Sequence, residues 1–243
     1  LEPGVVGGRG DGELDASGQP GRDGKWNGTT WNQLGNDIDG EVAGDKSNSN
    51  SLSSDGTIIA IGAIRNDGNG TDAGHVRVFQ WNGTTWNQLG NDIDGDNATD
   101  VSGKVSLSSD GTTVAIGGGG NSANGNDAGY VRIFDWNGAE WVKRGNNING
   151  EAADDYFGSS LALSSDGTTV AGGAWANDAN GTFSGHTRIF AWNGTSWVQR
   201  GSDIDGEAAE DQSGRDVSLS SDGNIVAISA NGDDDNGTNS GHT

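Results

Sequence analysis

The clearest indication of the fold is the run FGSSLALSSDGTTVAGGAWANDANGTFSGHTRIFAWNGTSW, from Phe157 to Trp197. It contains three short runs in which apolar and polar residues alternate, the pattern of half-buried β-strands, and turn signals separate them. Asn193-Gly194 follows the third run, and Asn-Gly between alternating runs is the strongest short-range signal of a β-hairpin. This stretch therefore predicts three antiparallel strands and the start of a fourth.

Related copies of this stretch fill most of the 243-residue chain. The Trp-Asn-Gly marker recurs every 55 or 56 residues, at Trp26, Trp81, Trp136 and Trp192. A repeat of this length with four antiparallel strands is typical of a β-propeller blade, and the 3.6-residue periodicity of helices is missing. We therefore expect an all-β protein, a β-propeller with about four blades in residues 25–243.

The number of blades stays open at this point. The third-strand motif occurs three times, so the chain predicts either a four-bladed ring with one defective blade or part of a longer propeller. Residues 1–24 match no repeat and are rich in glycine and aspartate, which predicts a tail or linker.

Composition argues against several classes of partner. The formal net charge is −22, whereas nucleic-acid phosphates are bound by clustered lysine and arginine. No apolar run approaches the roughly 18–20 residues of a membrane-spanning helix. The chain has no cysteine, so neither disulfides nor thiol chemistry are available to it.

Three motifs follow one another in one repeat: Phe157-Gly158, Gly173-Ala174 and the run GHTRIF at 185–190. Their order resembles the FG-GAP repeat, the blade of the propeller at the head of integrin α-subunits and of many surface proteins. The resemblance covers roughly residues 26–243. It implies an extracellular or cell-surface protein whose loop-rich face binds its ligands.

The chain departs from this family at the position of its calcium loop. Short turns such as Ser54-Asp55-Gly56 stand there, and one carboxylate cannot supply the roughly six to eight oxygens that calcium prefers. We expect these inherited calcium sites to be lost.

A second set of acidic loops is expected on the opposite face. Successive strands of a meander run in opposite directions, so the long loops within and between blades share one face. These loops contain 23 of the 35 aspartates and glutamates. Three of the inter-blade loops have the pattern Asp-x-Asp-Gly…Asp, which either converges on calcium or only makes turns.

The predicted calcium ligands of these inter-blade loops are Asp37, Asp39, Asp45, Asp92, Asp94, Asp100, Asp203, Asp205 and Asp211. Asp67, Asn69 and Asp72 form a similar set in one loop within a blade.

Asparagine and tryptophan provide further candidate sites. The sequons for N-glycosylation, which also suit plain turns, are Asn27, Asn69, Asn82, Asn97, Asn180, Asn193 and Asn236. A tryptophan pair flanks each hairpin turn and either packs or stacks on sugars. Trp175 stands outside this pattern and is the single candidate for ligand contact.

Some polar residues recur at one repeat position and favour a framework role. His75, His186 and His242 share a position that Tyr130 takes in the remaining copy. Arg77, Arg132 and Arg188 also recur, and we expect them to pair with a carboxylate of the neighbouring blade.

The sequence favours a non-enzymatic module for adhesion, scaffolding or surface structure, with contacts through the acidic face and with calcium as the only expected cofactor. Its partners would be other proteins, copies of itself or glycans. A carbohydrate-binding propeller and an accessory domain of a secreted enzyme are the alternatives. No arrangement of Ser, His and Asp, no Cys nucleophile and no phosphate loop stands out, so we do not expect an enzyme.

Overall fold

The computed structural model describes residues 24–234, 237–238 and 240–243. These residues form strands, turns and loops and no helix, which confirms the expectation of an all-β protein. Within this part of the chain, no helix is long and apolar enough to cross a membrane. The predicted tail, residues 1–24, lies outside the described residues except for Gly24.

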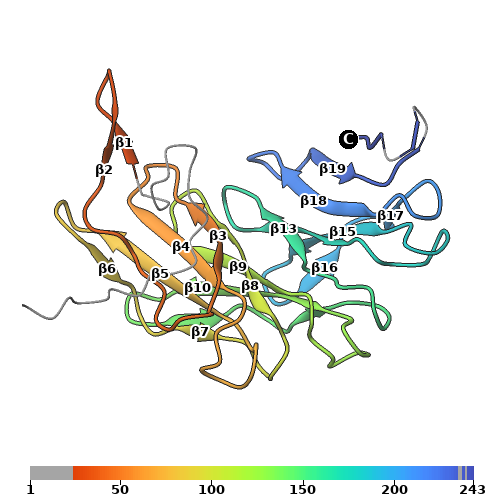
Figure 1. Cartoon of the computed structure of the whole chain (residues 1–243), viewed down its shortest axis with the longest axis horizontal. Helices are drawn as coiled ribbons and strands as arrows, with labels where there is room; N and C mark the ends of the chain where they lie inside the picture. The colour runs from red at the N-terminus through yellow and green to blue at the C-terminus, as the bar shows by residue number, and fades with distance from the viewer. Residues whose placement is uncertain (1–23, 235–236, 239) are drawn as a thin grey trace, which may run out of the picture.

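Each repeat folds into an antiparallel sheet whose strands are neighbours in chain order (Figure 1). The first sheet contains β3 (Ser47–Leu52), β4 (Ile58–Ala63), β5 (His75–Trp81) and β6 (Trp86–Gln88), and β7 (Ile93–Asp94) also pairs with β5. The second sheet contains β8 (Ser102–Leu107), β9 (Thr113–Gly118), β10 (Tyr130–Trp136) and β11 (Trp141–Lys143), with β12 (Ile148–Asn149) on β10.

The third sheet repeats this arrangement, and shorter elements stand at both ends. It contains β13 (Ser160–Leu163), β14 (Thr169–Ala174), β15 (His186–Trp192) and β16 (Trp197–Gln199), with β17 (Ile204–Asp205) on β15. A fourth sheet consists of β18 (Ser213–Leu219) and β19 (Val226–Ala230), and a hairpin of β1 (Gly24–Trp26) and β2 (Trp31–Gln33) precedes the first sheet. In Figure 1 the sheets follow one another along an arc, an arrangement like that of propeller blades.

The outermost strand of each repeat differs from the prediction. The sequence predicts a single fourth strand after the Trp-Asn-Gly turn, whereas the second sheet has two short strands there, β11 and β12, that both pair with β10. Gly145 lies between them with φ of 74°, and a Cβ there would come within 2.8 Å of the Trp192 ring. The left-handed backbone and the close approach both require glycine at this break.

The predicted hairpins are confirmed at each Trp-Asn-Gly marker. Trp81 pairs with Trp86 across the β5–β6 hairpin, and their ring centroids are 5.4 Å apart. The Asn82 side chain accepts a hydrogen bond of 2.9 Å from the backbone N–H of Thr84 and another of 2.9 Å from that of Thr85. Local side-chain hydrogen bonds of this kind fix a turn independently of the rest of the fold.

The apolar core lies between consecutive sheets. Ile58, Val76 and Val78 of the first sheet are buried against Val105 and Leu107 of the second sheet. A second cluster fills the next interface, between the second and third sheets. Each sheet is therefore stabilised by its neighbours, as expected for repeats that cannot bury their faces alone.

Glycines allow neighbouring sheets to approach closely. A Cβ on Gly117 of β9 would overlap the carbonyl oxygen of Gly158, which follows Phe157 in the next repeat. Gly62 and Gly173 make the same approach to Gly103 and Gly214. The glycines of the Phe-Gly and Gly-Ala motifs thus allow the backbones of neighbouring sheets to contact each other directly at these three junctions.

Short Ser-Asp-Gly turns join the sheets on the face opposite the long loops. The backbone N–H of Ser109 donates to the carbonyl of Ser165 at 2.8 Å, and Ser165 donates to Ser221 at 2.9 Å. The carboxylate of Asp166 accepts hydrogen bonds from the hydroxyls of Ser164 and Thr168. These hydrogen bonds lower the pKa of Asp166.

Candidate functional site: the acidic loop face and the sheet junctions

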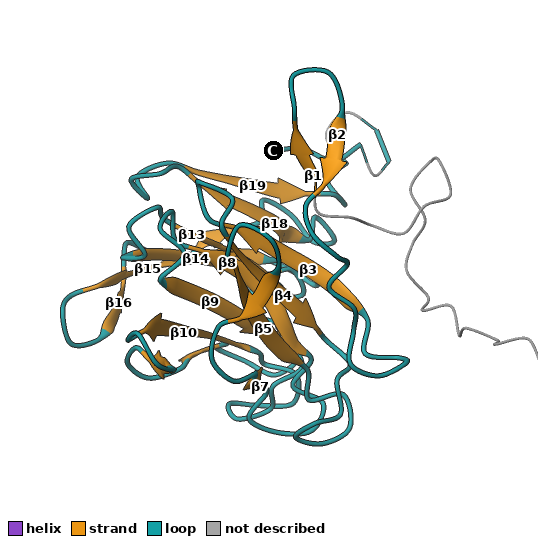
Figure 2. Ribbon diagram, turned by 90° about the vertical axis from the view of Figure 1, so that its left-hand side faces the viewer, coloured by secondary structure: helices purple, strands orange, loops and turns teal. Residues whose placement is uncertain are grey.

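The long loops gather at one end of the strands, around β7 (Figure 2). Loop 65–73 of the first sheet and the following loop 91–101 are hydrogen-bonded through their backbones, and Val101 N donates to Asp72 O at 3.1 Å. Corresponding bonds recur in the second and third sheets. We call the surface formed by loops 36–46, 65–73, 91–101, 121–128, 146–156, 176–184 and 202–212 the loop face. Its loops hold one another in place.

One aspartate of each inter-sheet loop is buried and ties the loop to the next sheet. Asp100 is 1% exposed, and its carboxylate accepts hydrogen bonds from Asn97 N at 3.0 Å and from Asn121 Nδ2 at 2.9 Å. The aspartates buried at the same repeat position are Asp45, Asp155 and Asp211. Three predicted calcium ligands, Asp45, Asp100 and Asp211, thus serve the fold.

The other two aspartates of each predicted triple lie apart from this buried one. The first of each triple, Asp37, Asp92 or Asp203, accepts a hydrogen bond of 2.5–2.6 Å from a nearby glutamine. The second of each triple, Asp39, Asp94 or Asp205, is exposed. In the described residues, none of the three triples forms a cluster of three carboxylates at metal-binding distance. Calcium binding at these positions stays a prediction.

The predicted set within the first sheet braces the loops. Asp67 Oδ1 accepts a hydrogen bond from Asp72 N at 2.8 Å, across the base of its own loop. Asn69 Nδ2 donates to Gly95 O in the following loop at 2.7 Å. Two of the three predicted ligands therefore have structural hydrogen bonds, and calcium binding by this set is not tested.

An arginine crosses each junction between repeats. Arg132 is 3% exposed, and it donates to the carbonyl of Asp94 at 2.7 Å and to the carboxylate of Asp96 at 2.7 Å. Arg77 lies 3.8 Å from Glu41 and Arg188 lies 3.3 Å from Glu151, and both arginines also donate to a carbonyl of the preceding loop. The expected pairing between arginine and the neighbouring repeat is confirmed. Removing the carboxylate would leave a buried and uncompensated charge.

A histidine stands beside two carboxylates at two of these junctions. His75 is 1% exposed, and its Nδ1 lies 3.8 Å from Glu41 Oε2 and 3.6 Å from Asp92 Oδ2. His186 is fully buried, and its group with Glu151 and Asp203 has one ligand atom per residue within 4.8 Å of the others.

The environment of His186 favours the neutral imidazole. Neither ring nitrogen of His186 has a hydrogen-bond partner in the structure. Burial lowers the pKa of His186 and the Arg188 guanidinium lowers it further, whereas Asp203 and Glu151 oppose the shift. A buried imidazole with free nitrogens beside carboxylates has the donor atoms that a divalent metal requires.

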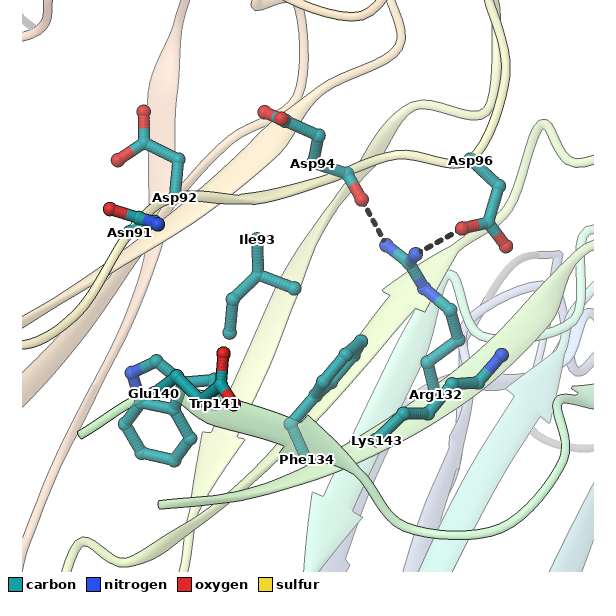
Figure 3. A pocket seen from close by; sticks show the side chains of 10 residues that line it. All are labelled: Asn91, Asp92, Ile93, Asp94, Asp96, Arg132, Phe134, Glu140, Trp141 and Lys143. Atoms are coloured by element: carbon teal, nitrogen blue, oxygen red, sulfur yellow. Dashed lines mark hydrogen bonds and ion pairs between the residues drawn. The ribbon is translucent and has the colours of Figure 1, made fainter. Parts of the chain in front are cut away.

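A cleft of about 330 Å³ opens at the junction between the first and second sheets (Figure 3). The second sheet carries Tyr130 at the position of the histidine. Figure 3 shows Arg132 reaching between the Asp94 carbonyl and the Asp96 carboxylate. Lys143 lies on the same wall, and burial lowers its pKa while Asp96 opposes this shift. In the cleft a positive group from the protein thus lies close to the carboxylate of Asp96.

The hairpin tryptophans pack at the junctions. Trp86 Nε1 donates to Leu34 O of the preceding hairpin at 2.9 Å, and Trp141 Nε1 donates to Leu89 O at 2.8 Å. Trp197 makes the corresponding bond to Arg144 O at 3.0 Å. The sequence left two roles open for the hairpin tryptophans, packing or stacking on sugars. These hydrogen bonds to the preceding repeat support the packing role.

Trp175 belongs to an aromatic group that only the third sheet has among the described repeats. Its ring stacks with Tyr156 at 5.5 Å and with Phe183 at 6.1 Å between centroids. The guanidinium of Arg215 lies 3.7 Å from the centroid of the Trp175 ring. Phe183 is 39% exposed, so the group reaches the surface of the loop face.

The sequons occupy exposed positions in the described residues, and Asn236 lies outside them. Asn27, Asn82 and Asn193 accept hydrogen bonds within their hairpin turns. The side-chain nitrogens of Asn69 and Asn180 instead donate to carbonyls of neighbouring loops. A glycan on either nitrogen would compete with this bond, and glycosylation stays a prediction.

Comparisons with known proteins give no family. No protein-family model matches the chain, and no curated protein matches it. Among solved structures, the chain is similar to a candidate 6-phosphogluconolactonase from Bacteroides fragilis, with 14% identity and a TM-score of 0.49, over 77% of this chain and 43% of that one.

Two further structures have comparable similarity. A candidate 6-phosphogluconolactonase from Bacteroides uniformis has 14% identity and a TM-score of 0.49, over 88% of this chain and 55% of that one. Hydrazine synthase from Kuenenia stuttgartiensis has 16% identity and a TM-score of 0.47, over 76% of this chain and 43% of that one. The chain therefore spans about half the length of these structures, and similarity at this level carries no argument about activity.

Proposed function

We propose that this chain is a non-enzymatic adhesion or scaffolding module of the extracellular space or the cell surface. Its contacts are made through the loop face. The observation that supports this most strongly is that acidic loops of consecutive repeats are hydrogen-bonded to one another through their backbones. A surface that is already ordered loses little entropy on binding, and its negative charge attracts cations towards it.

Calcium is the second part of this proposal. Exposed carboxylates of Asp39, Asp94 and Asp205 line the loop face, and carboxylate oxygens are ligands that calcium prefers. Because the predicted triples are not gathered into preformed cages, the affinity belongs in the range of extracellular modules, about 10⁻⁴–10⁻³ M. In this range calcium bridges the face to an acidic partner or to a second copy of the chain.

A bead-aggregation assay tests the proposed role. Beads that carry the chain should cluster in millimolar calcium and disperse in a chelator, and the variant Asp94→Asn/Asp205→Asn should cluster less. Glu140→Gln removes an exposed charge from a hairpin turn outside the loop face and serves as the matched control. Clustering that ignores both calcium and the loop-face variant would contradict the proposal.

We also infer that the described sheets belong to a larger propeller than a closed ring of four. Leu52 of the first sheet is 55% exposed, whereas Leu107 at the same position of the second sheet is 7% exposed. Ile225 of the fourth sheet is 71% exposed, whereas its counterpart Ile58 is 8% exposed. Both ends of the arc thus expose apolar side chains. At the same repeat positions inside the arc, an adjoining repeat buries the corresponding side chains. Closure by the four sheets alone would cover them.

A carbohydrate-binding role is the second candidate, supported by the aromatic group of Tyr156, Trp175 and Phe183. Aromatic rings at a surface stack on the apolar faces of sugars, and this group departs from the symmetry of the repeats. A glycan array followed by titration should then show binding that Trp175→Ala abolishes and Trp31→Ala leaves intact. Loss of binding in both variants, or no binding by the natural chain, would argue against it.

A further inference from the structure

We propose that Glu41, His75 and Asp92 bind one divalent transition-metal ion, and that Glu151, His186 and Asp203 bind a second. Zn²⁺ is the ion that represents this class. The two sites lie at corresponding junctions between repeats, and they are independent of the proposed adhesive role.

The distances suit a small ion. In the first site, Nδ1 of His75 lies 3.8 Å from Glu41 Oε2 and 3.6 Å from Asp92 Oδ2. Two ligand atoms at the usual zinc distances of about 2.1 Å lie about 3.4 Å apart in a tetrahedral site. Shifts of a few tenths of an ångström would therefore bring each carboxylate oxygen to this separation from Nδ1, and all three ligand atoms lie within 4.8 Å of one another. In the second site the three ligand atoms lie within 4.8 Å of one another, and Asp205 Oδ1 is also 3.9 Å from His186.

The buried His186 points to a ligand independently of the carboxylates. His186 is 0% exposed, and both of its ring nitrogens lack a hydrogen-bond partner. Leaving buried polar atoms unpaired costs about 1–3 kcal/mol each, so native proteins rarely do so without a reason. A metal on His186 would satisfy one of these nitrogens. Asp205 Oδ1 lies 3.9 Å from Nδ1, and Glu151 and Asp203 each offer a carboxylate oxygen within 4.8 Å.

The remaining oxygens of the carboxylates are already held. Glu41 lies 3.8 Å from Arg77 through Oε1, which leaves Oε2 facing His75. Asp92 Oδ1 accepts a hydrogen bond from Gln88 Nε2, which leaves Oδ2 facing His75. Gln199 holds Asp203 in the same way. Hydrogen bonds to the second oxygen orient metal ligands, and metalloproteins use them widely.

The second sheet shows what replaces the site where histidine is missing. Tyr130 takes the histidine position, Asn147 takes the aspartate position and Lys143 takes the glutamine position. The three positions change together, and Lys143 brings its own positive charge near Asp96. The junction between the first and second sheets lacks the histidine and aspartate ligands of a metal ion. At this junction the positive charge of Lys143 stands in place of the ion.

The donor set selects the class of metal. Imidazole nitrogen together with carboxylate oxygen suits zinc and similar transition metals, whereas calcium takes roughly six to eight oxygens. Glu41 and Asp92 are 41% and 28% exposed at their side chains, so solvent reaches the site from one side. The ion would therefore keep an open position for water or a further ligand. Glu41 precedes the first sheet in the chain and His75 lies within it, so the ion also joins two repeats.

Zinc binding by the untagged full chain tests this proposal. The chain is treated with a chelator, dialysed against Zn²⁺ and analysed for metal per chain, with calorimetry and thermal unfolding alongside. We expect two Zn²⁺ per chain and a higher melting temperature in zinc, because a ligand that binds the folded state stabilises it. Excess Ca²⁺ should not displace them.

The variants copy residues that the chain already accommodates in its second sheet. His75→Tyr/Asp92→Asn and His186→Tyr/Asp203→Asn should each lower the zinc content from two to one, and the combined variant should bind none. Asp37→Asn is the matched control, because Asp37 is held by a glutamine as Asp92 is but has no histidine at the corresponding position. It should still bind two.

A milder variant keeps the test decisive if a double variant unfolds. Asp92→Asn alone should weaken zinc binding at one site by at least about tenfold, while the other site is unchanged. No zinc binding by the natural chain, or zinc content that these substitutions leave at two, would overturn the proposal.

Discussion

Two leucines at one repeat position provide a matched test of how the sheets are arranged. Leu107 of β8 is 7% exposed at the junction between the first and second sheets, whereas Leu52 of β3 is 55% exposed at the end of the arc. Replacing each by alanine removes the same atoms from the same place in the strand. Only the number of neighbouring repeats differs between the two sites.

The expected costs follow from this difference in burial. Truncation of a buried leucine to alanine costs about 2–5 kcal/mol, because it loses transfer free energy and leaves a cavity. A half-exposed leucine leaves no enclosed cavity and keeps much of its surface in water, so Leu52→Ala should cost less than about 1 kcal/mol. We therefore expect Leu107→Ala to be the more destabilising by more than about 1 kcal/mol.

Urea unfolding followed by tryptophan fluorescence measures both free energies. The slope of free energy against urea should be the same for the two variants, so that the change in midpoint reports stability. Equal losses in the free energy of unfolding for Leu52→Ala and Leu107→Ala would refute an arrangement in which Leu52 lies at an uncovered end of the arc of sheets. They would mean that another repeat or a second copy covers Leu52.

Three further predictions concern the contacts that join the repeats. Gly117→Ala should destabilise the chain by about 1–3 kcal/mol or more in urea unfolding, because its methyl group would overlap the Gly158 carbonyl. Gly40→Ala is the mild control, because a Cβ on Gly40 would come no closer than 3.7 Å to Ser47. Trp141→Phe should cost about 0.5–1.5 kcal/mol more than Trp31→Phe, because it removes the hydrogen bond to Leu89 O while Trp31 is 71% exposed; equal costs would contradict the junction role. The hydrogen bonds from the Ser220 hydroxyl and from Asn224 lower the pKa of Asp222 to about 2, below the value of about 3.9 in the unfolded chain. The contribution of Asp222 to the stability of the folded chain is therefore complete above about pH 4 and is lost as the pH falls towards 2. Asp222→Asn should flatten the loss of stability between pH 5 and pH 2 in urea titrations, and an unchanged slope would show that this carboxylate does not contribute.

The sequence predicted the local structure well because local signals determine it. Asn82-Gly83 between two alternating runs fixes a hairpin through hydrogen bonds within a few residues, and the structure has that hairpin. The break between β11 and β12 was missed, although Gly145 stands at it. This glycine is required by the approach of Trp192 from the next repeat, and such a contact is not visible in a local pattern.

The candidate site was harder to predict for the same reason. The aspartates at 37, 39 and 45 are close in sequence, which suggested one cation site, but Asp45 is buried against Asn66 while Asp39 is exposed. The repeat pattern predicts a framework role for His75, and its neighbours Glu41 and Asp92 come from two different loops and are not adjacent to it in the sequence. One signal was available: His75 and His186 occur with Asp92 and Asp203, whereas Tyr130 occurs with Asn147 at the same spacing.

Amide hydrogen exchange tests the claim that the loop face is one rigid surface. The amides of Val101, Tyr156 and Gln212 donate to the neighbouring loop at 2.9–3.1 Å, so each reports a link between two loops. If the claim holds, these amides exchange as slowly as those of the adjoining strands, because opening them requires the junction to open. Exchange at the rate of freely exposed loop amides would mean that the loops move independently, and it would contradict the account.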